Sequence, residues 1–265
     1  MKLISLIDNE TRGGCCAEHG LSLYLELSSG RKILFDMGQG PLFSENARKL
    51  GIDLGRVDTA VISHGHYDHG GGLETWLGIN EKSRIYVRRD AFLPHFSVSG
   101  GDPRDIGLDR RLSSGERLVF SGDIEEIEPG AVLFSNVGGR HTLPPGDELL
   151  IGENGHRDSF SHEQNLLIKE DGRTFLFAGC AHAGILNIMD RAEEISDGPL
   201  DVVVAGLHLA HCDGSYVEKL AKELSGRGDC LFVTMHCTLW NNYLKMKDIL
   251  GDRLEYLSCG QEFLY

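Results

Sequence analysis

The six residues at positions 64–69, His-Gly-His-Tyr-Asp-His, place three imidazoles and one carboxylate in a single short segment. Neutral imidazole is the commonest metal-binding side chain in proteins, and a neighbouring carboxylate suits zinc, manganese or iron. An apolar run at residues 57–62 precedes the segment, and three glycines at positions 70–72 follow it. The pattern predicts a metal-binding loop at the end of a β-strand.

The spacing within this segment predicts two sets of metal ligands. His64, His66 and Asp68 are two residues apart, so in extended backbone their side chains point to the same side. Asp68 and His69 are adjacent and can diverge where a strand turns into a helix. Two histidines can then hold one ion while Asp68 and His69 hold a second. The three glycines permit a tight turn into a helix expected at residues 73–77.

Three further histidines each follow an apolar run with the composition of a buried strand: His182, His208 and His236. Ligands of open α/β sheets bind at the carboxyl ends of the strands. We therefore expect these side chains to meet the segment at residues 64–69 along one edge of the fold. The remaining histidines lie in expected loops, where a surface position is the simpler interpretation: His19, His95, His141, His156, His162 and His211.

The elements that would position these residues alternate between strand and helix patterns. Strands are expected at residues 2–7, 21–27, 31–35, 57–62, 84–87, 117–120, 131–134, 165–169, 174–178, 201–205, 231–235 and 254–257. Helices are expected at residues 42–50, 73–77, 185–195, 216–224 and 241–250. Residues 92–115 and 138–161 are polar and aperiodic, and the first stretch is typical of a long loop or lid. Hairpins followed by β–α units in each half predict two packed sheets with outer helices, in one domain spanning residues 1–265.

Composition excludes several classes of function. The 265 residues carry a formal net charge of −14, which disfavours a nucleic-acid-binding surface. Apolar runs are too short to span a membrane, and residues 1–8 are typical of a first strand rather than a secretory signal. Seven cysteines without regular spacing do not suggest a disulfide framework. We therefore expect a cytoplasmic protein that binds neither nucleic acid nor membrane. The sequence is compatible with a homo-oligomer but does not decide the oligomeric state.

Several motifs together resemble the metallo-β-lactamase superfamily. The segment at 64–69 is similar to its metal signature, and Asp36 in Leu-Phe-Asp-Met-Gly (34–38) is similar to the aspartate that supports the metal loop. Further segments resemble the subfamily that includes 7,8-dihydropterin-6-methyl-4-(β-D-ribofuranosyl)aminobenzene-5′-phosphate synthase. They are Glu-His-Gly-Leu-Ser (18–22), Gly-Cys-Ala-His-Ala-Gly-Ile (179–185), Gly-Leu-His-Leu (206–209) and His-Cys-Thr (236–238). The resemblance implies an α+β fold: a four-layer αβ/βα sandwich of two packed mixed sheets, with a dinuclear site at one edge.

The same resemblance implies which residues hold two divalent ions, with zinc expected and manganese or iron as alternatives. One ion would take His64, His66 and His182, and the other would take Asp68, His69 and His236. Two positions leave this set open. Cys180 stands where the superfamily usually has a bridging aspartate, and as a soft ligand of the second ion it would favour zinc. His162 is the alternative upstream histidine, which would leave His182 to the substrate.

A dinuclear site of this kind implies a metal-dependent hydrolase that activates a bridging hydroxide and acts on a small, anionic phosphorylated or ester substrate. Asp68 would orient the nucleophile and His208 would act as general acid or as a donor to the substrate. Candidate phosphate contacts are His19, His156 and Arg157. One alternative is a transferase that joins a pterin diphosphate to an aminobenzene ribofuranosyl phosphate, and another is a non-catalytic metal-binding module. The arginine-rich stretch at 99–111 could supply an anion pocket, although such stretches are usually solvated.

Overall fold

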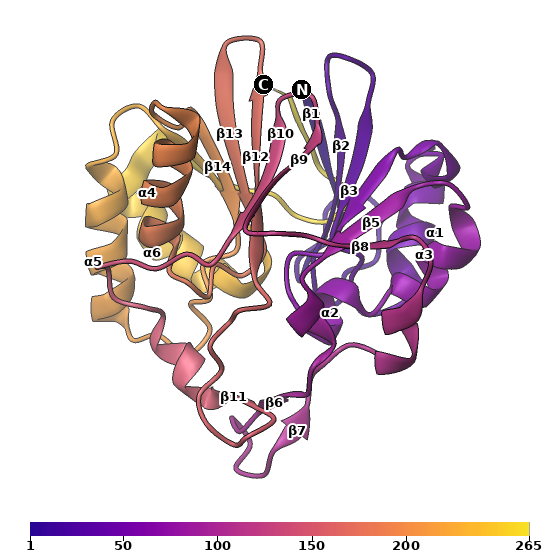
Figure 1. Ribbon diagram of the computed structural model, residues 1–265. Helices are drawn as coiled ribbons and strands as arrows, with labels where there is room; N and C mark the ends of the chain where they lie inside the picture. The colour runs from indigo at the N-terminus through magenta and orange to yellow at the C-terminus, as the bar shows by residue number, and fades with distance from the viewer. Residues whose placement is uncertain (265) are drawn as a thin grey trace.

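The computed structural model describes residues 1–264 and contains two seven-stranded mixed sheets that pack against each other (Figure 1). The first sheet has the order β17 (Glu262–Leu264), β1 (Lys2–Ile7), β2 (Ser22–Glu26), β3 (Lys32–Phe35), β4 (Thr59–Val61), β5 (Arg84–Val87) and β8 (Leu118–Phe120). The second has the order β16 (Leu254–Tyr256), β15 (Leu231–Thr234), β14 (Val202–Ala205), β13 (Arg173–Ala178), β12 (Gln164–Glu170), β10 (Ala131–Ser135) and β9 (Ile124–Glu128). Tyr265, the last residue of the predicted domain, lies outside the described residues.

Helices on the outer faces of the two sheets complete four layers (Figure 1). The first sheet carries α1 (Leu42–Lys49) and α3 (Leu73–Ile79), and the second carries α4 (Ile185–Ser196), α5 (Gly214–Ser225) and α6 (Trp240–Leu250). This αβ/βα sandwich confirms the predicted fold class. Across residues 1–264 the helices are too short or too polar for any of them to cross a bilayer.

Side-chain alternation along the strands explains the layered packing. Ile33 and Phe35 of β3 belong to the core between the sheets, whereas Leu34 packs with the helices on the outer face. In β14, Val204 points into the core between the sheets and Val203 points toward α4 to α6. Because both faces of these strands are buried, their sequences are almost continuously apolar. The apolar runs seen in the sequence are therefore strands covered on both sides.

The parallel strands of both sheets end at the same edge, where the histidine-bearing segments lie. Strand β3 pairs in parallel with β4, and β13, β14 and β15 pair in parallel in the second sheet. The loops after β4, β13, β14 and β15 carry the four segments that the sequence singled out. A single helical turn, α2 (Tyr67–Gly70), begins within the first of these loops.

A third, small sheet lies at this edge and corrects the prediction of irregular structure at residues 92–115 and 138–161. It has the order β11 (Leu150–Gly152), β6 (His95–Ser97) and β7 (Arg104–Asp105), and a 3-10 helix at Pro145–Leu149 precedes β11. Its strands are only two or three residues long, and β11 pairs with the distant β6, so no local periodicity indicates them. The outermost strands β9 and β17 were also missed, and β9 is acidic, as suits an exposed edge.

Candidate metal centre

Three residues at the site edge adopt left-handed backbone conformations that non-glycine residues rarely take. The φ angle is 62° at Asp36, 48° at His208 and 48° at His236. Each such residue costs on the order of 1–3 kcal/mol, and residues of this kind concentrate at functional sites. The backbone therefore turns abruptly where β3, β14 and β15 end, and it aims polar side chains at the space between the two sheets.

One cluster consists of three buried imidazoles whose Nε2 atoms face one another. His64, His66 and His182 each offer a ligand atom, and the three atoms lie within 4.8 Å of one another. All three Nε2 atoms are buried and have no hydrogen-bond partner among the described residues. Burial lowers the pKa of each imidazole, which keeps it in the neutral form that binds metal. Three unpartnered nitrogens that converge in this way fit a metal ion.

Hydrogen bonds to the far sides of these rings leave the Nε2 lone pairs free. Asp147 Oδ1 lies 2.7 Å from Nδ1 of His182, so this nitrogen carries the proton that it donates. Ser63 Oγ donates to Asp36 Oδ2 at 2.7 Å and therefore accepts from Nδ1 of His64 at 2.9 Å. A carboxylate or hydroxyl behind a ligand imidazole is the usual support of a metal-binding histidine. The tautomers of His64 and His182 thus suit metal binding.

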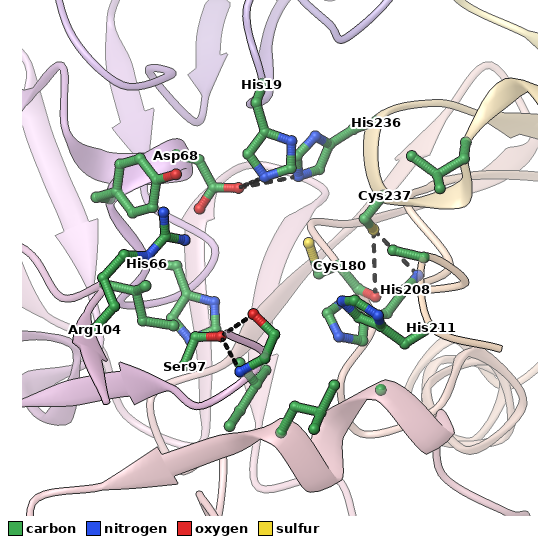
Figure 2. A pocket seen from close by; sticks show the side chains of 18 residues that line it. His19, His66, Asp68, Ser97, Arg104, Cys180, His208, His211, His236 and Cys237 are labelled. Carbon is green, nitrogen blue, oxygen red and sulfur yellow. Dashed lines mark hydrogen bonds and ion pairs between the residues drawn. The ribbon is translucent and has the colours of Figure 1, made fainter. Parts of the chain in front are cut away.

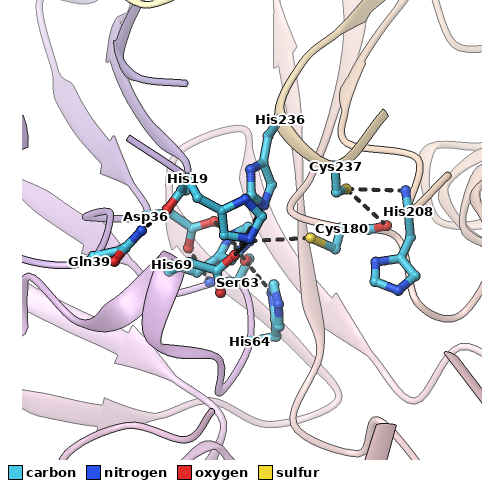
Figure 3. A network of polar contacts seen from close by, with 12 residues as sticks. His19, Asp36, Gln39, Ser63, His64, His69, Cys180, His208, His236 and Cys237 are labelled. Atoms are coloured by element: carbon cyan, nitrogen blue, oxygen red, sulfur yellow. Dashed lines mark hydrogen bonds and ion pairs between the residues drawn. The ribbon is translucent and has the colours of Figure 1, made fainter. Parts of the chain in front are cut away.

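A second cluster lies beside the first and combines nitrogen, oxygen and sulfur (Figure 3). The Nε2 atoms of His69 and His236 are 3.1 Å apart, and Asp68 Oδ2 lies 3.3 Å from Nε2 of His236. Cys180 Sγ lies 3.2 Å from Nε2 of His69. The second cluster therefore has room for the predicted set Asp68, His69 and His236, and it adds the thiol of Cys180.

The rings of the second cluster are also oriented from behind. Asp36 Oδ2 lies 2.7 Å from Nδ1 of His69, and Asn9 Oδ1 lies 2.8 Å from Nδ1 of His236. Asn9 Oδ1 accepts a further bond from the backbone of Gly20, which establishes this atom as the acceptor oxygen. Both imidazoles consequently turn their Nε2 lone pairs toward the cluster.

The electrostatics of the second cluster favour positive charge. Burial alone would lower the pKa of His69, but Asp36 and Asp68 outweigh this effect and raise it. Burial alone would also raise the pKa of Asp68, but His69, His19 and His236 outweigh it and hold that pKa well below its usual range. A buried site that stabilises both a protonated imidazole and an ionised carboxylate also suits a metal cation.

His19, expected to contact phosphate, lies against the second cluster. Its Nε2 atom is 3.1 Å from Asp68 Oδ2, and its ring centroid is 4.9 Å from that of His236. More than half of the His19 side chain is exposed, unlike the side chains of the other cluster members. His19 belongs to the connection between β1 and β2, and nothing in its sequence surroundings indicated this contact.

His162, the alternative ligand, has both ring nitrogens engaged elsewhere. Its Nδ1 accepts a hydrogen bond of 2.9 Å from the backbone N–H of Gly65, and its Nε2 lies 3.3 Å from Asp158 Oδ2. The next residue, Glu163, accepts bonds of 2.7 and 2.9 Å from the backbone N–H groups of His182 and Ala183. This segment therefore supports both metal-binding loops from behind, and His182 rather than His162 turns a free nitrogen toward His64.

His208 lies at the rim of the site. Its Nε2 atom is 3.5 Å from Asp147 Oδ1, and its Nδ1 has no partner among the described residues. Its backbone N–H donates to Cys237 Sγ at 3.1 Å. About one seventh of the His208 side chain is exposed. The ring therefore stands between the buried clusters and the open space above them.

A cavity of about 150 Å³ opens onto both clusters. Figure 2 shows Arg104 and Ser97 on one side of it and His208, His211 and Cys237 on the other. His66, Asp68, Cys180 and His236 also line it. A small molecule in this cavity would contact the metal-ligating groups directly.

The other two predicted phosphate contacts lie away from this cavity. His156 is exposed in the turn after β11, where its backbone N–H donates to Asn154. Arg157 lines a separate cavity of about 420 Å³, together with His95 and Asp158. The structure thus brings His19 to the site but not His156 or Arg157.

Several buried groups that orient the ligands have no distinctive sequence signal. Asp147 lies in a stretch expected to be irregular, and Glu163 precedes a strand. Asp8 accepts a 2.6 Å bond from the backbone N–H of His236, a residue 228 positions away. The residues next to these carboxylates share no pattern that would indicate their partners.

The metallo-beta-lactamase superfamily model matches residues 17–206, which include the metal loop, Cys180 and His182. The chain belongs to the metallo-beta-lactamase superfamily. The match agrees with the arrangement of sheets, the strand-end loops and the clustered histidines described above.

Three similar proteins match over most of the chain. The crystal structure of Tm1679, described as a metal-dependent hydrolase of the beta-lactamase superfamily, is 30% identical, covers 100% of this chain and 99% of its own, and gives a TM-score of 0.86. An uncharacterized protein of Methanocaldococcus jannaschii is 27% identical over 92% of this chain and 93% of its own length. A protein of the same organism named 7,8-dihydropterin-6-methyl-4-(beta-D-ribofuranosyl)-aminobenzene-5′-phosphate synthase is 28% identical over 84% of this chain and 81% of its own length.

Proposed function

We propose that this protein is a dinuclear metal-dependent hydrolase that acts on a small anionic ester or phosphoester. The observation that carries the proposal is the set of three buried Nε2 atoms of His64, His66 and His182, which converge without partners. A solvated or purely structural histidine cluster would leave no such set, because buried polar atoms are normally hydrogen-bonded.

In this proposal His64, His66 and His182 hold the first ion, and Asp68, His69 and His236 hold the second. Cys180 Sγ, 3.2 Å from His69 Nε2, adds a soft donor to the second position. Thiolate and imidazole ligands favour zinc over manganese. We therefore propose zinc as the native metal at both positions.

The residues around the ions divide the work of hydrolysis. Two bound zinc ions would lower the pKa of a water and polarise the oxygen of the bond to be cleaved. Asp68 would accept a hydrogen bond from that water and aim it at the substrate. His208, at the rim and with a free Nδ1, would donate a proton or a hydrogen bond to the leaving oxygen. Asp147 would hold the ring of His182, and its position 3.5 Å from Nε2 of His208 would help to orient that side chain.

A transferase is the second candidate, and the observation in its favour is the 28% identity to the named pterin synthase. Such an enzyme would join a pterin diphosphate to an aminobenzene ribofuranosyl phosphate and release pyrophosphate. The match to the metal-dependent hydrolase Tm1679 is slightly higher in identity and covers more of the chain, and for this reason we favour hydrolysis.

Elemental analysis of protein purified without added metal, together with a hydrolysis screen, tests the proposal. We expect about two zinc ions per chain and turnover of at least one member of a panel of carboxylic esters, lactones, phosphomonoesters and phosphodiesters. His66→Ala should lower the metal content and abolish turnover, whereas the matched variant His141→Ala should retain both, because His141 pairs with Asp190 on the surface.

Three results would contradict the proposal. Full metal content and turnover in His66→Ala would remove His66 from the site. Formation of the coupled product from the two pterin-synthase precursors, with no hydrolysis of the panel, would favour the transferase. Protein that binds neither zinc, manganese nor iron would instead indicate a degenerate site.

A further inference from the structure

The small sheet formed by β11, β6 and β7 presents a row of three side chains to the cavity. In the register of this sheet Leu150 is opposite Ser97, and Ser97 is opposite Arg104. Residues directly opposite each other on neighbouring strands place their side chains on the same face. All three residues line the cavity that opens onto the metal clusters. The sheet therefore builds one wall of the substrate site.

Arg104 is the only arginine or lysine that lines this cavity within residues 1–264. Its guanidinium carbon lies 5.8 Å from the centre of the Tyr67 ring, and Tyr67 belongs to the metal loop. The backbone N–H of Tyr67 donates to the carbonyl of Ile106 at 2.8 Å, which fastens the strand that carries Arg104 to that loop. No carboxylate among the described residues forms an ion pair with Arg104. The exposed guanidinium thus lies beside the metal loop with no carboxylate paired to it.

Ser97 and Ser99 each place a hydroxyl group in the cavity that Arg104 lines. The Oγ of Ser97 lies 3.0 Å from the Oγ of Ser99. Only one hydroxyl proton is used between the two oxygens, so the other remains free to donate to a ligand. A guanidinium fork and a hydroxyl give at least three donors, which suits the three terminal oxygens of a phosphate group.

Apolar side chains lie next to Arg104, Ser97 and Leu150 in the cavity. They suit an apolar group attached to a bound phosphate. Leu150 continues the row, and Leu149 and Leu239 line the same cavity. The protein as a whole carries a net charge of −14, so an anion would be drawn to this site only by a local cation such as Arg104. The wall therefore combines an anion-binding end with an apolar surface.

We propose that Arg104, Ser97 and Ser99 form a phosphate-binding subsite that selects substrates carrying a phosphate on an apolar group, apart from the bond that is cleaved. This inference rests on the proposed function, because it deepens the description of the same cavity. Figure 2 shows the arrangement that carries it, with Arg104 and Ser97 on one side of the cavity, His208 and His211 on the other, and Asp68 and Cys180 also lining it. The metal-ligating residues would then act on a bond at the other end of the molecule.

Calorimetric titration of the metal-loaded protein with phenyl phosphate and with inorganic phosphate tests the subsite. We expect phenyl phosphate to bind more tightly than inorganic phosphate because of the leucines. Arg104→Met should weaken the binding of phenyl phosphate about 10- to 100-fold, as expected for loss of charge-assisted hydrogen bonds. Its metal content should stay that of the wild type. Arg110→Met is the matched control, since Arg110 lies on the same segment but pairs with Asp105 and does not line the cavity.

Each other outcome overturns the inference. Unchanged affinity in Arg104→Met would mean that phosphate binds to the metal ions themselves. An equal loss in Arg110→Met would indicate unspecific attraction, and tighter binding of a short RNA oligonucleotide than of phenyl phosphate would indicate a nucleic-acid surface. These failures leave metal content and ester hydrolysis of the wild type intact, whereas failure of the proposed function removes them. The two can therefore be told apart.

Discussion

The Nδ1 atom of His162 accepts a hydrogen bond from the backbone N–H of Gly65, which lies between the two metal-loop histidines His64 and His66. This bond joins the segment that precedes β12 in the second sheet to the metal loop that follows β4 in the first sheet. Asp158 sets its direction, because the carboxylate accepts from Nε2–H of His162 and leaves Nδ1 as the acceptor. A residue whose motif position suggested a metal ligand therefore positions the loop that carries two ligands.

His162→Ala should weaken zinc binding by about 10- to 100-fold, as loss of a group that orients metal ligands typically does. His162→Asn should recover part of this loss, because its amide oxygen can take the position of Nδ1. Competition with a chromophoric chelator measures both constants. An unchanged zinc affinity in the alanine variant would show that Gly65 needs no such partner.

Gly179→Ala tests how closely the two sheets approach at the site. A Cβ at this position would overlap Ser63 Oγ and would lie 3.1 Å from Nδ1 of His64. We expect the free energy of unfolding to fall by about 1–3 kcal/mol, as overpacking of a core does, and zinc affinity to fall with it because His64 is displaced. Urea denaturation provides the first measurement.

Gly78→Ala is the matched control for this substitution. Gly78 lies within α3, and an added Cβ would meet nothing within 4 Å. The free energy of unfolding should rise by about 0.4–1 kcal/mol, because alanine restricts the unfolded chain. A loss of similar size in both variants would contradict the close approach at Gly179.

Cys180 can be tested as a ligand by cobalt substitution. If its thiolate binds the second ion, the cobalt-loaded protein should show a sulfur-to-metal charge-transfer band that Cys180→Ser lacks. Cys16→Ser should keep the band, because Cys16 is exposed and outside both clusters. A band of wild-type intensity in Cys180→Ser would assign the sulfur ligand to Cys237, whose thiol belongs to the same group of ligand atoms.

The pairing of Asp158 with two histidines predicts a pH-dependent contribution to stability. Burial alone would raise the pKa of Asp158, but hydrogen bonds from His162 and His95 outweigh it and hold that pKa well below its usual range. Because the folded-state pKa is below that of the unfolded chain, about 3.9, the contribution is complete at neutral pH and is lost as the pH falls below about 4–5.

Asp158→Asn should therefore lower the free energy of unfolding by about 2 kcal/mol at pH 7, and this loss should shrink once the pH falls below about 4. Urea denaturation of both proteins in the presence of a chelator measures the difference without a contribution from metal release. A difference that stays constant from pH 7 down to about pH 2 would argue against an ionised Asp158 as the stabilising partner.

Much of the fold and part of the site follow from local features of the sequence. The sequence shows the two-residue spacing in the metal loop and the apolar runs before His182, His208 and His236. These features can be recognised without a structure, because strand periodicity and the position of strand ends depend only on neighbouring residues. The same local rules gave the strands of both large sheets except the outermost β9 and β17. They also indicated that the chemistry would gather at one edge.

Only the tertiary structure decided which groups face one another across that edge. The contact of His19 with Asp68, the bond from Gly65 to His162 and the row formed by Leu150, Ser97 and Arg104 each join segments far apart in the chain. Such contacts depend on the register of the sheets and on how the two halves of the chain pack. Neither the register nor the packing produces a periodic pattern in the sequence. The sequence by itself indicated the types of side chain that gather at this edge and the strands that carry them, and the packing of the strands determined which of these side chains meet.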